Sequence, residues 1–109
     1  DAVYLTALAA EAAGSTDPTD IRDALRDVAN PAGTDVGPGT EGFTAALRVL
    51  AGGGAVNYEG AAGPVDLDAN GDVLIGAIET WHVDAANLEL VTDDVFKVDL
   101  NTNEVTKVE

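Results

Sequence analysis

The sequence predicts an α/β fold in which three helices are followed by β-hairpins. Up to Ala51, apolar side chains recur at the three- and four-residue spacing of helices, and Gly, Pro or Asx residues mark the helix ends. Beyond that point, short segments of alternating apolar and polar residues are separated by turns that contain Asn and Gly. Helices therefore precede strands, as in α/β or α+β proteins.

The first helix is expected over Ala2–Ala13, with Asp1 as its N-cap and Gly14 as its stop. Only Thr6 and Glu11 are clearly polar within it. A helix that is apolar almost all round is normally buried on more than one side. We therefore expect that this helix packs against structure that the other residues of this chain do not supply.

The second helix is expected from Pro18 to about Ala29, since Asp17 is a good N-cap and proline suits the first helical position. Its buried face would carry Ile21, Ala24, Leu25 and Val28.

A loop is expected over Asn30–Gly39, which holds two Pro and three Gly residues. Thr40 would then cap a third helix, Glu41–Ala51, and Gly52–Gly54 would end it. The buried side chains of this helix would be Phe43, Ala46, Leu47 and Leu50.

The second half of the chain predicts hairpins. A polar loop over Asn57–Gly63 would lead into a strand around Pro64–Leu67, and the turn Asp68–Asp72 would reverse the chain into a strand over Leu74–Val83. The Asn-Gly pair inside that turn is a strong hairpin signal, because both residues tolerate positive φ. Further strands are expected over Leu88–Val91, Val95–Leu100 and Glu104–Val108, the last two joined by a turn at Asn101–Asn103.

Charge limits the partners of this chain. Its 109 residues include 20 acidic and 5 basic side chains, so the net charge is -15. Nucleic acid is not expected as a partner, because phosphate contacts need clustered Lys and Arg. An anionic membrane surface would also repel the chain, and no run of residues is long and apolar enough to insert. Adaptation to high salt and simple solubility both explain the acidity.

The sequence does not predict an enzyme or a cofactor. It has no cysteine, and Ser15 and His82 are its only serine and histidine. Ser15 belongs to a helix-start loop, and His82 has no nucleophile near it in the sequence. The Gly-rich segments lack the Lys and Ser or Thr of a phosphate-binding loop.

One segment resembles the first half of a calcium loop. Asp66, Asp68, Asn70 and Asp72 supply oxygens at alternate positions, with Gly71 at the sharp turn. The acidic residue needed at the twelfth position is replaced by Ala77. A structural turn is the favoured interpretation, and a weak cation site is the alternative.

Within Asn57–Val83 the sequence carries, in this order, Asn-Tyr-Glu-Gly, Gly-Pro-Val, Asp-x-Asp-x-Asn-Gly-Asp and a strand with Trp. This order resembles the C-terminal part of periplasmic binding proteins for branched-chain amino acids. These are type I solute-binding subunits of ABC transporters. Asp1–Tyr4 and Ile21–Leu25 resemble two helices of the same family. Residues 1–83 would be the family's C-terminal segment, and residues 84–109 a strand-rich extension.

The resemblance implies an extracytoplasmic protein, periplasmic or at the cell surface, that captures a branched-chain or similar amino acid and delivers it to an ABC permease. The two lobes of these proteins close on the ligand about strand hinges. Most ligand-binding residues would precede this chain, so the upstream part of the same protein is an expected partner. Of the residues present, Asp1 could approach the ligand, and Trp81 and His82 would lie near a hinge.

Two other classes of function remain open. One is an acidic, calcium-stabilised surface module that uses the Asp66–Asp72 segment. The other is a self-assembling structural protein in which exposed strand edges pair with neighbouring copies.

Overall fold

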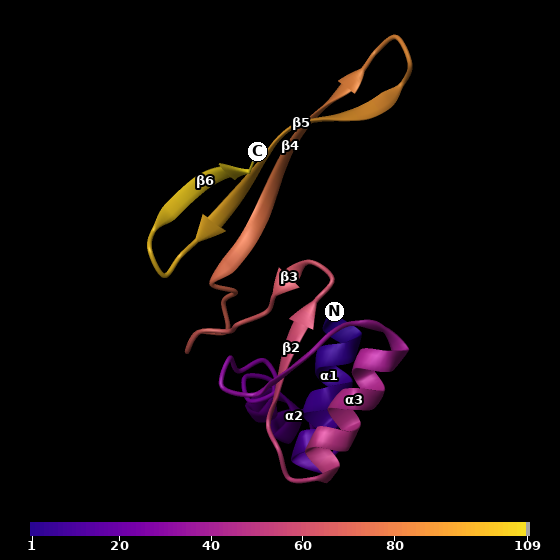
Figure 1. Cartoon of the computed structure of the whole chain (residues 1–109), viewed down its shortest axis with the longest axis vertical. Helices are drawn as coiled ribbons and strands as arrows, with labels where there is room; N and C mark the ends of the chain where they lie inside the picture. Colours follow the sequence, from indigo (N-terminus) through magenta and orange to yellow (C-terminus); the bar gives the residue numbers. More distant parts are fainter. Residues whose placement is uncertain (109) are drawn as a thin grey trace. The chain divides into compact units, whose positions relative to one another are not determined.

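The chain forms two compact units in a computed structural model that describes residues 1–108. Unit 1 is Asp1–Val73 and unit 2 is Leu74–Glu109. Unit 1 contains three helices and a three-stranded sheet, and unit 2 contains a second three-stranded sheet (Figure 1). The predicted mixed α/β class with three helices is confirmed at this level.

Helix α1 covers Ala2–Ala13, as predicted. It ends at Gly14, whose left-handed backbone (φ 61°) lets its N–H bond to the Glu11 carbonyl. Asp1 is the N-cap residue, as predicted, but its side chain makes no capping hydrogen bond. Its carboxylate is instead occupied by donors from a distant segment, described below. The buried residues of α1 are Leu5, Leu8 and Ala9.

Helix α2 covers Pro18–Ala24 and is shorter than predicted. Its start is confirmed, because Asp17 Oδ1 accepts the N–H of the second helical residue at 2.8 Å. The expected continuation to Ala29 is wrong. The Val28 carbonyl accepts the Tyr58 N–H at 2.9 Å, so this backbone bonds to a strand rather than to another helical turn.

A parallel β-α-β unit follows, formed by β1 (Thr34–Val36), α3 (Gly39–Ala51) and β2 (Val56–Gly60). The strands pair in parallel from Thr34↔Val56 to Val36↔Tyr58. The predicted loops Asn30–Gly39 and Asn57–Gly63 are therefore wrong where β1 and β2 run through them.

The N-cap of α3 is Pro38, which has an extended backbone and offers no side-chain hydrogen bond. The predicted cap Thr40 lies inside the helix, and its carbonyl accepts the Thr44 hydroxyl. That capping prediction is wrong because the helix begins two residues earlier than predicted, at Gly39 instead of Glu41.

The predicted hairpin between Pro64–Leu67 and Leu74–Val83 does not form. Strand β3 is only Gly63–Pro64, and it pairs antiparallel with the end of β2. A single bridge, Leu67↔Val73, closes the turn at Asp68–Asp72. The Asn-Gly signal thus marks a real turn, but the strand that follows it pairs elsewhere.

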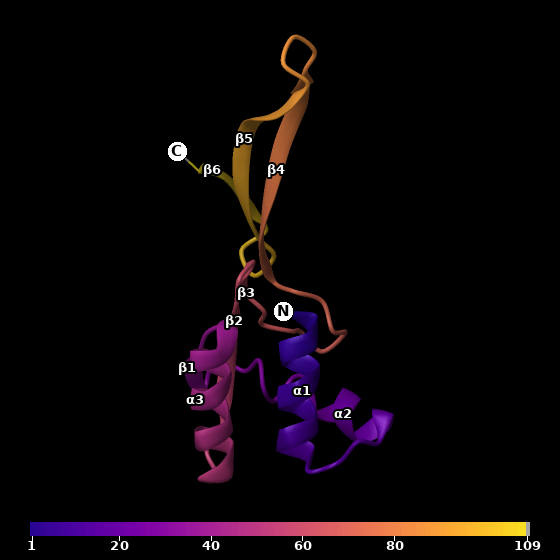
Figure 2. The same ribbon diagram turned by 90° about the vertical axis from the view of Figure 1, so that its right-hand side faces the viewer.

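The buried apolar residues all lie in unit 1, where α1 packs against both α2 and α3 (Figure 2). Tyr58, Val56 and Val36 contribute the sheet side of this core. The predicted helix faces are broadly confirmed: Ala24, Val28 and Ala46 are buried, while Ile21, Leu25, Phe43, Leu47 and Leu50 are half-buried.

Unit 2 is an antiparallel sheet in the order β4-β5-β6, with β4 at Ile75–Asp84, β5 at Glu89–Asp99 and β6 at Glu104–Val108. The predicted hairpin ending at Val108 is confirmed. The strands predicted over Leu88–Val91 and Val95–Leu100 are parts of one strand, β5. That strand carries one extra residue, Asp93, because the register shifts between Thr80 and Trp81.

Candidate functional sites

The Asp1 carboxylate joins the start of α1 to the segment around β2. One oxygen accepts the Tyr58 hydroxyl and the Ala61 N–H, each at 2.9 Å, and the other accepts the Ala62 N–H at 3.2 Å. Three donors converge on one carboxylate, which is strong electrostatic support for its negative charge. Asp1, proposed from the sequence as a ligand contact, thus has structural partners within unit 1.

Aromatic rings surround this contact. The Tyr58 side chain is 1% exposed and stacks on Tyr4, with ring centroids 6.1 Å apart. The ring of Phe43 also contacts Tyr4, with ring centroids 5.6 Å apart and a tilt of 58°. Burial, with a smaller contribution from Tyr4, raises the pKa of Tyr58 above its usual value of 10.0.

The Asp68–Asp72 segment is a self-contained turn. Asp68 Oδ1 accepts the N–H groups of Asn70 and Asp72 at 2.7 and 2.9 Å, and its other oxygen faces the Asn70 amide. These bonds, with the Asp72 N–H as the largest contributor, lower the pKa of Asp68 below 3.8.

Arg26 donates hydrogen bonds to two backbone carbonyls of the same turn. Its Nε donates to the Asp68 carbonyl and its Nη2 to the Ala69 carbonyl, both at 3.0 Å. A calcium loop needs free carboxylate and carbonyl oxygens that point at one ion, whereas a guanidinium group already lies against this turn. Residues 1–108 contain no cluster of three or more metal-ligating His, Cys, Asp or Glu side chains.

The Asp68 turn should make the stability of unit 1 depend on acid pH. A carboxyl group with a lowered folded pKa contributes stability that is present above its unfolded pKa of about 3.9 and is lost as the pH falls through the folded value. We expect Asp68→Asn to remove this contribution. The free energy of unfolding would be compared from pH 6 to 2 (roughly the range in which Asp titrates), and equal pH profiles for both proteins would contradict the assignment.

Arg26→Ala should destabilise unit 1 by about 1 kcal/mol, because two charged hydrogen bonds between exposed groups are lost. Arg22→Ala is the matched control, since Arg22 pairs only with its exposed neighbour Asp23, a contact worth little. Urea unfolding followed by the helical circular dichroism signal would compare the two variants, and equal losses would overturn the role of Arg26.

A buried amide links the two parallel strands. Asn57 is 4% exposed, and its Nδ2 donates to Asp35 Oδ1 at 3.0 Å and to Glu59 Oε1 at 2.8 Å. Its Oδ1 is buried without a hydrogen-bond partner among the described residues. Sequence reasoning missed this cluster, because Asp35 reaches Asn57 and Glu59 only through the parallel pairing of β1 and β2.

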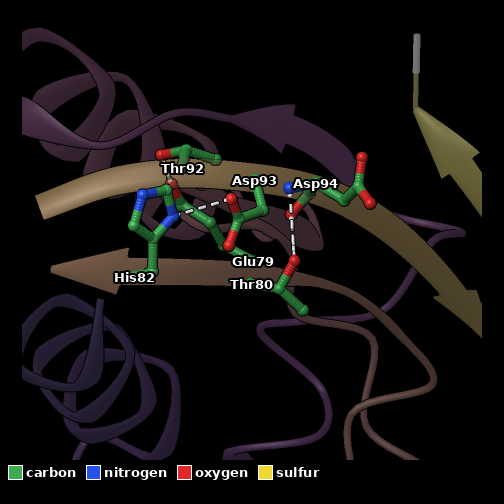
Figure 3. A network of polar contacts seen from close by, with 6 residues as sticks. All are labelled: Glu79, Thr80, His82, Thr92, Asp93 and Asp94. Carbon is green, nitrogen blue, oxygen red and sulfur yellow. Dashed lines mark hydrogen bonds and ion pairs between the residues drawn. The ribbon is translucent and has the colours of Figure 1, made fainter. Parts of the chain in front are cut away.

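Trp81 and His82 lie in unit 2, directly after the register shift. Figure 3 shows His82 beside Asp93. His82 Nδ1 lies 2.8 Å from Asp93 Oδ1, so the extra residue of β5 is the partner of His82. Thr80 Oγ1 bonds to the N–H and carbonyl of Asp94. A bulge of this kind bends and twists a strand pair, which is a suitable place for the hinge that the sequence predicts.

No helix within residues 1–108 has the length and apolarity needed to cross a membrane. Comparisons of the chain with protein-family models, with characterised proteins and with solved structures found no match.

Proposed function

We propose that this chain forms part of an extracytoplasmic solute-binding protein, which captures a branched-chain or similar amino acid for an ABC importer. The chain performs no covalent chemistry in this role. It contributes packing and hinge elements, and most of the ligand pocket belongs to the upstream part of the same protein.

The observation that carries this proposal is the Asp1–Tyr58 contact. The segments that resemble the binding-protein family are Asp1–Tyr4 at one end and Asn57–Gly60 more than fifty residues later. They meet through a hydrogen bond and a ring stack in one packed cluster. Two segments that are far apart in the sequence, and that each resemble the same family, thus lie in one packed cluster.

The open parts of unit 1 support a larger parent fold. Its parallel pairing involves only β1 and β2, and β1 forms an edge of the sheet among the described residues. Parallel sheets normally belong to larger α/β sheets whose faces are covered. One face of α1 is also an apolar surface, where Val3 is 82% exposed: Ala2, Val3, Thr6, Ala7 and Ala10. A second lobe segment would cover such surfaces.

The mechanism would be closure of two lobes about strand hinges. Ligand contacts made by both lobes favour the closed state, and the permease would recognise that state. Trp81 and His82 would act here by setting how the strand bends beside the bulge, without touching the ligand.

The test is ligand binding by the encoded polypeptide, including any residues that precede Asp1. Thermal unfolding would be followed with L-leucine, L-isoleucine and L-valine, and with D-leucine as the matched control. A ligand at 100 times its Kd should stabilise the folded state by about 2.7 kcal/mol. Stabilisation by an L-amino acid but not by the D-enantiomer supports the proposal. No stabilisation by any amino acid would overturn it.

A further inference from the structure

Within the described sheet of unit 2, no strand pairs with the outer edge of β4. Strand β4 is ten residues long and lies at the edge of the β4-β5-β6 sheet. We propose that the β4 edge pairs antiparallel with the β4 edge of a second copy of this chain, about a two-fold axis at Thr80, to give a continuous six-stranded sheet. This proposal is independent of the solute-binding role.

The polar side chains of β4 do not block strand pairing at this edge. Glu79 accepts a hydrogen bond from the Thr92 hydroxyl, and His82 contacts Asp93 (Figure 3). Thr80 bonds to the backbone of Asp94. These three side chains are therefore held by β5, on the side opposite the open edge. The fourth polar side chain, Asp84, accepts hydrogen bonds from Ala86 and Asn87 in the following turn.

Several protective devices are also missing from β4. Natural edge strands avoid pairing through charged side chains, especially lysine, and through proline, short length or a bulge. Ile75–Asp84 contains no lysine and no proline, and the extra residue at the bulge belongs to β5. The ten-residue edge is thus suited to accept another strand.

Backbone direction and charge together select one register. The Leu74 carbonyl accepts the Leu100 N–H, so Leu74 faces β5. By the alternation of antiparallel strands, Ile75, Ala77, Glu79, Trp81 and Val83 then direct their backbone groups to the open edge. Two-fold pairing centred on Glu79 or on Thr80 would use almost the whole strand.

The centre at Glu79 places two carboxylates directly opposite each other, which is destabilising. The centre at Thr80 places Glu79 opposite Trp81, and Ala77 opposite Val83, of the second copy. In this register the two Trp81 rings are diagonal neighbours, within reach of each other. Trp81 and Val83, which are 58% and 55% exposed in the single copy, would lose exposed area.

The net charge of the chain makes this association depend on salt concentration. Each copy carries a net charge of -15, so two copies repel each other at low salt. Salt screens that repulsion, and self-pairing should strengthen as salt rises. Binding to a basic partner strand would weaken under the same change, which distinguishes the two occupants of the edge.

A cysteine substitution tests the register. The chain has no cysteine, so Thr80→Cys creates a single thiol at the two-fold axis. Thr80 would sit opposite its copy as a non-hydrogen-bonded pair, whose Cα atoms are about 4.5 Å apart, a distance that a disulfide can span. Under mild oxidation, Thr80→Cys should become mostly covalent dimer. Ala85 lies in the turn after β4, so Ala85→Cys should form at least about tenfold less covalent dimer than Thr80→Cys (~1.4 kcal/mol).

The unmodified chain gives a second readout. Sedimentation velocity at about 0.1 M and about 1 M salt, where the Debye length falls from ~10 to ~3 Å, should show dimer increasing with salt and protein concentration. Trp81 fluorescence should shift to the blue with dimer. A monomer under all conditions, or equal cross-linking of Thr80→Cys and Ala85→Cys, would overturn the proposal.

Discussion

Replacing Tyr58 with alanine is expected to lower the free energy of unfolding of unit 1 by about 3–5 kcal/mol, the range for removing a buried aromatic side chain. Tyr58 is 1% exposed and is among the largest fully buried side chains of the described residues. Its loss would leave a cavity beside Tyr4 and would free the Asp1 carboxylate from one of its three donors. All the described helices lie in unit 1, so the helical circular dichroism signal in a urea titration reports on this unit.

Tyr58→Phe is the matched variant, because it keeps the ring and removes only the hydroxyl. We expect a loss of about 1–2 kcal/mol for the hydrogen bond to Asp1. If the phenylalanine variant lost as much as the alanine variant, the hydroxyl rather than the ring would dominate. If neither variant lost stability, the packing of Tyr58 against α1 would be contradicted.

The raised pKa of Tyr58 adds a pH signature to the same pair of proteins. A tyrosine whose folded pKa lies above the unfolded value of 10.0 contributes stability that is complete below pH 10 and falls as the pH rises through the folded pKa. The Asp1 carboxylate acts in the same direction, since it accepts a hydrogen bond only from the protonated hydroxyl. Alkaline unfolding should therefore depend on pH more steeply with Tyr58 than with phenylalanine.

The elements that the sequence predicted correctly depend on local signals. Asp17 followed by proline defines the start of α2, and Gly14 ends α1 through a left-handed residue. The turn at Asp68–Asp72 is equally local, because a carboxylate bonds to N–H groups two and four residues later.

The errors arise where distant backbone segments compete for hydrogen bonds. β1 lies in a segment rich in Gly and Pro, and only its pairing with β2 makes it a strand. The Tyr58 N–H of β2 also bonds to the Val28 carbonyl, so the backbone at Val28 does not continue α2. Strand propensity is weak beside such tertiary contacts, so neither result could be predicted from composition.

The residues of the candidate site show the same difference between local signals and tertiary contacts. Asp1 was expected to cap a helix, yet three donors near Tyr58 hold its carboxylate. An N-cap preference is worth about 1 kcal/mol, which three hydrogen bonds to one charged group can outweigh. The roles predicted for Trp81 and His82 remain predictions, now attached to a bulge that the sequence did not indicate.

Gly33→Ala is expected to destabilise unit 1 by about 2–3 kcal/mol or more, because an added methyl group would overlap the main chain of β2. A Cβ at Gly33 would lie 2.4 Å from the Val56 carbonyl carbon and 2.8 Å from the Asn57 nitrogen. Backbone atoms in a paired strand are unable to move aside as a side chain can. The first β1–β2 pair, Thr34↔Val56, would have to separate, and with it the contact that buries Asn57.

Gly37→Ala provides the comparison within the same segment. A Cβ at Gly37 meets no atom within 4 Å, and its backbone needs no left-handed conformation. Alanine there should be neutral or stabilising by up to about 1 kcal/mol, through reduced entropy of the unfolded chain. A large loss for Gly33→Ala beside none for Gly37→Ala would identify close strand approach as the cause. Equal effects would mean that this Gly-rich segment acts through flexibility, and that the β1–β2 contact is looser than its geometry indicates.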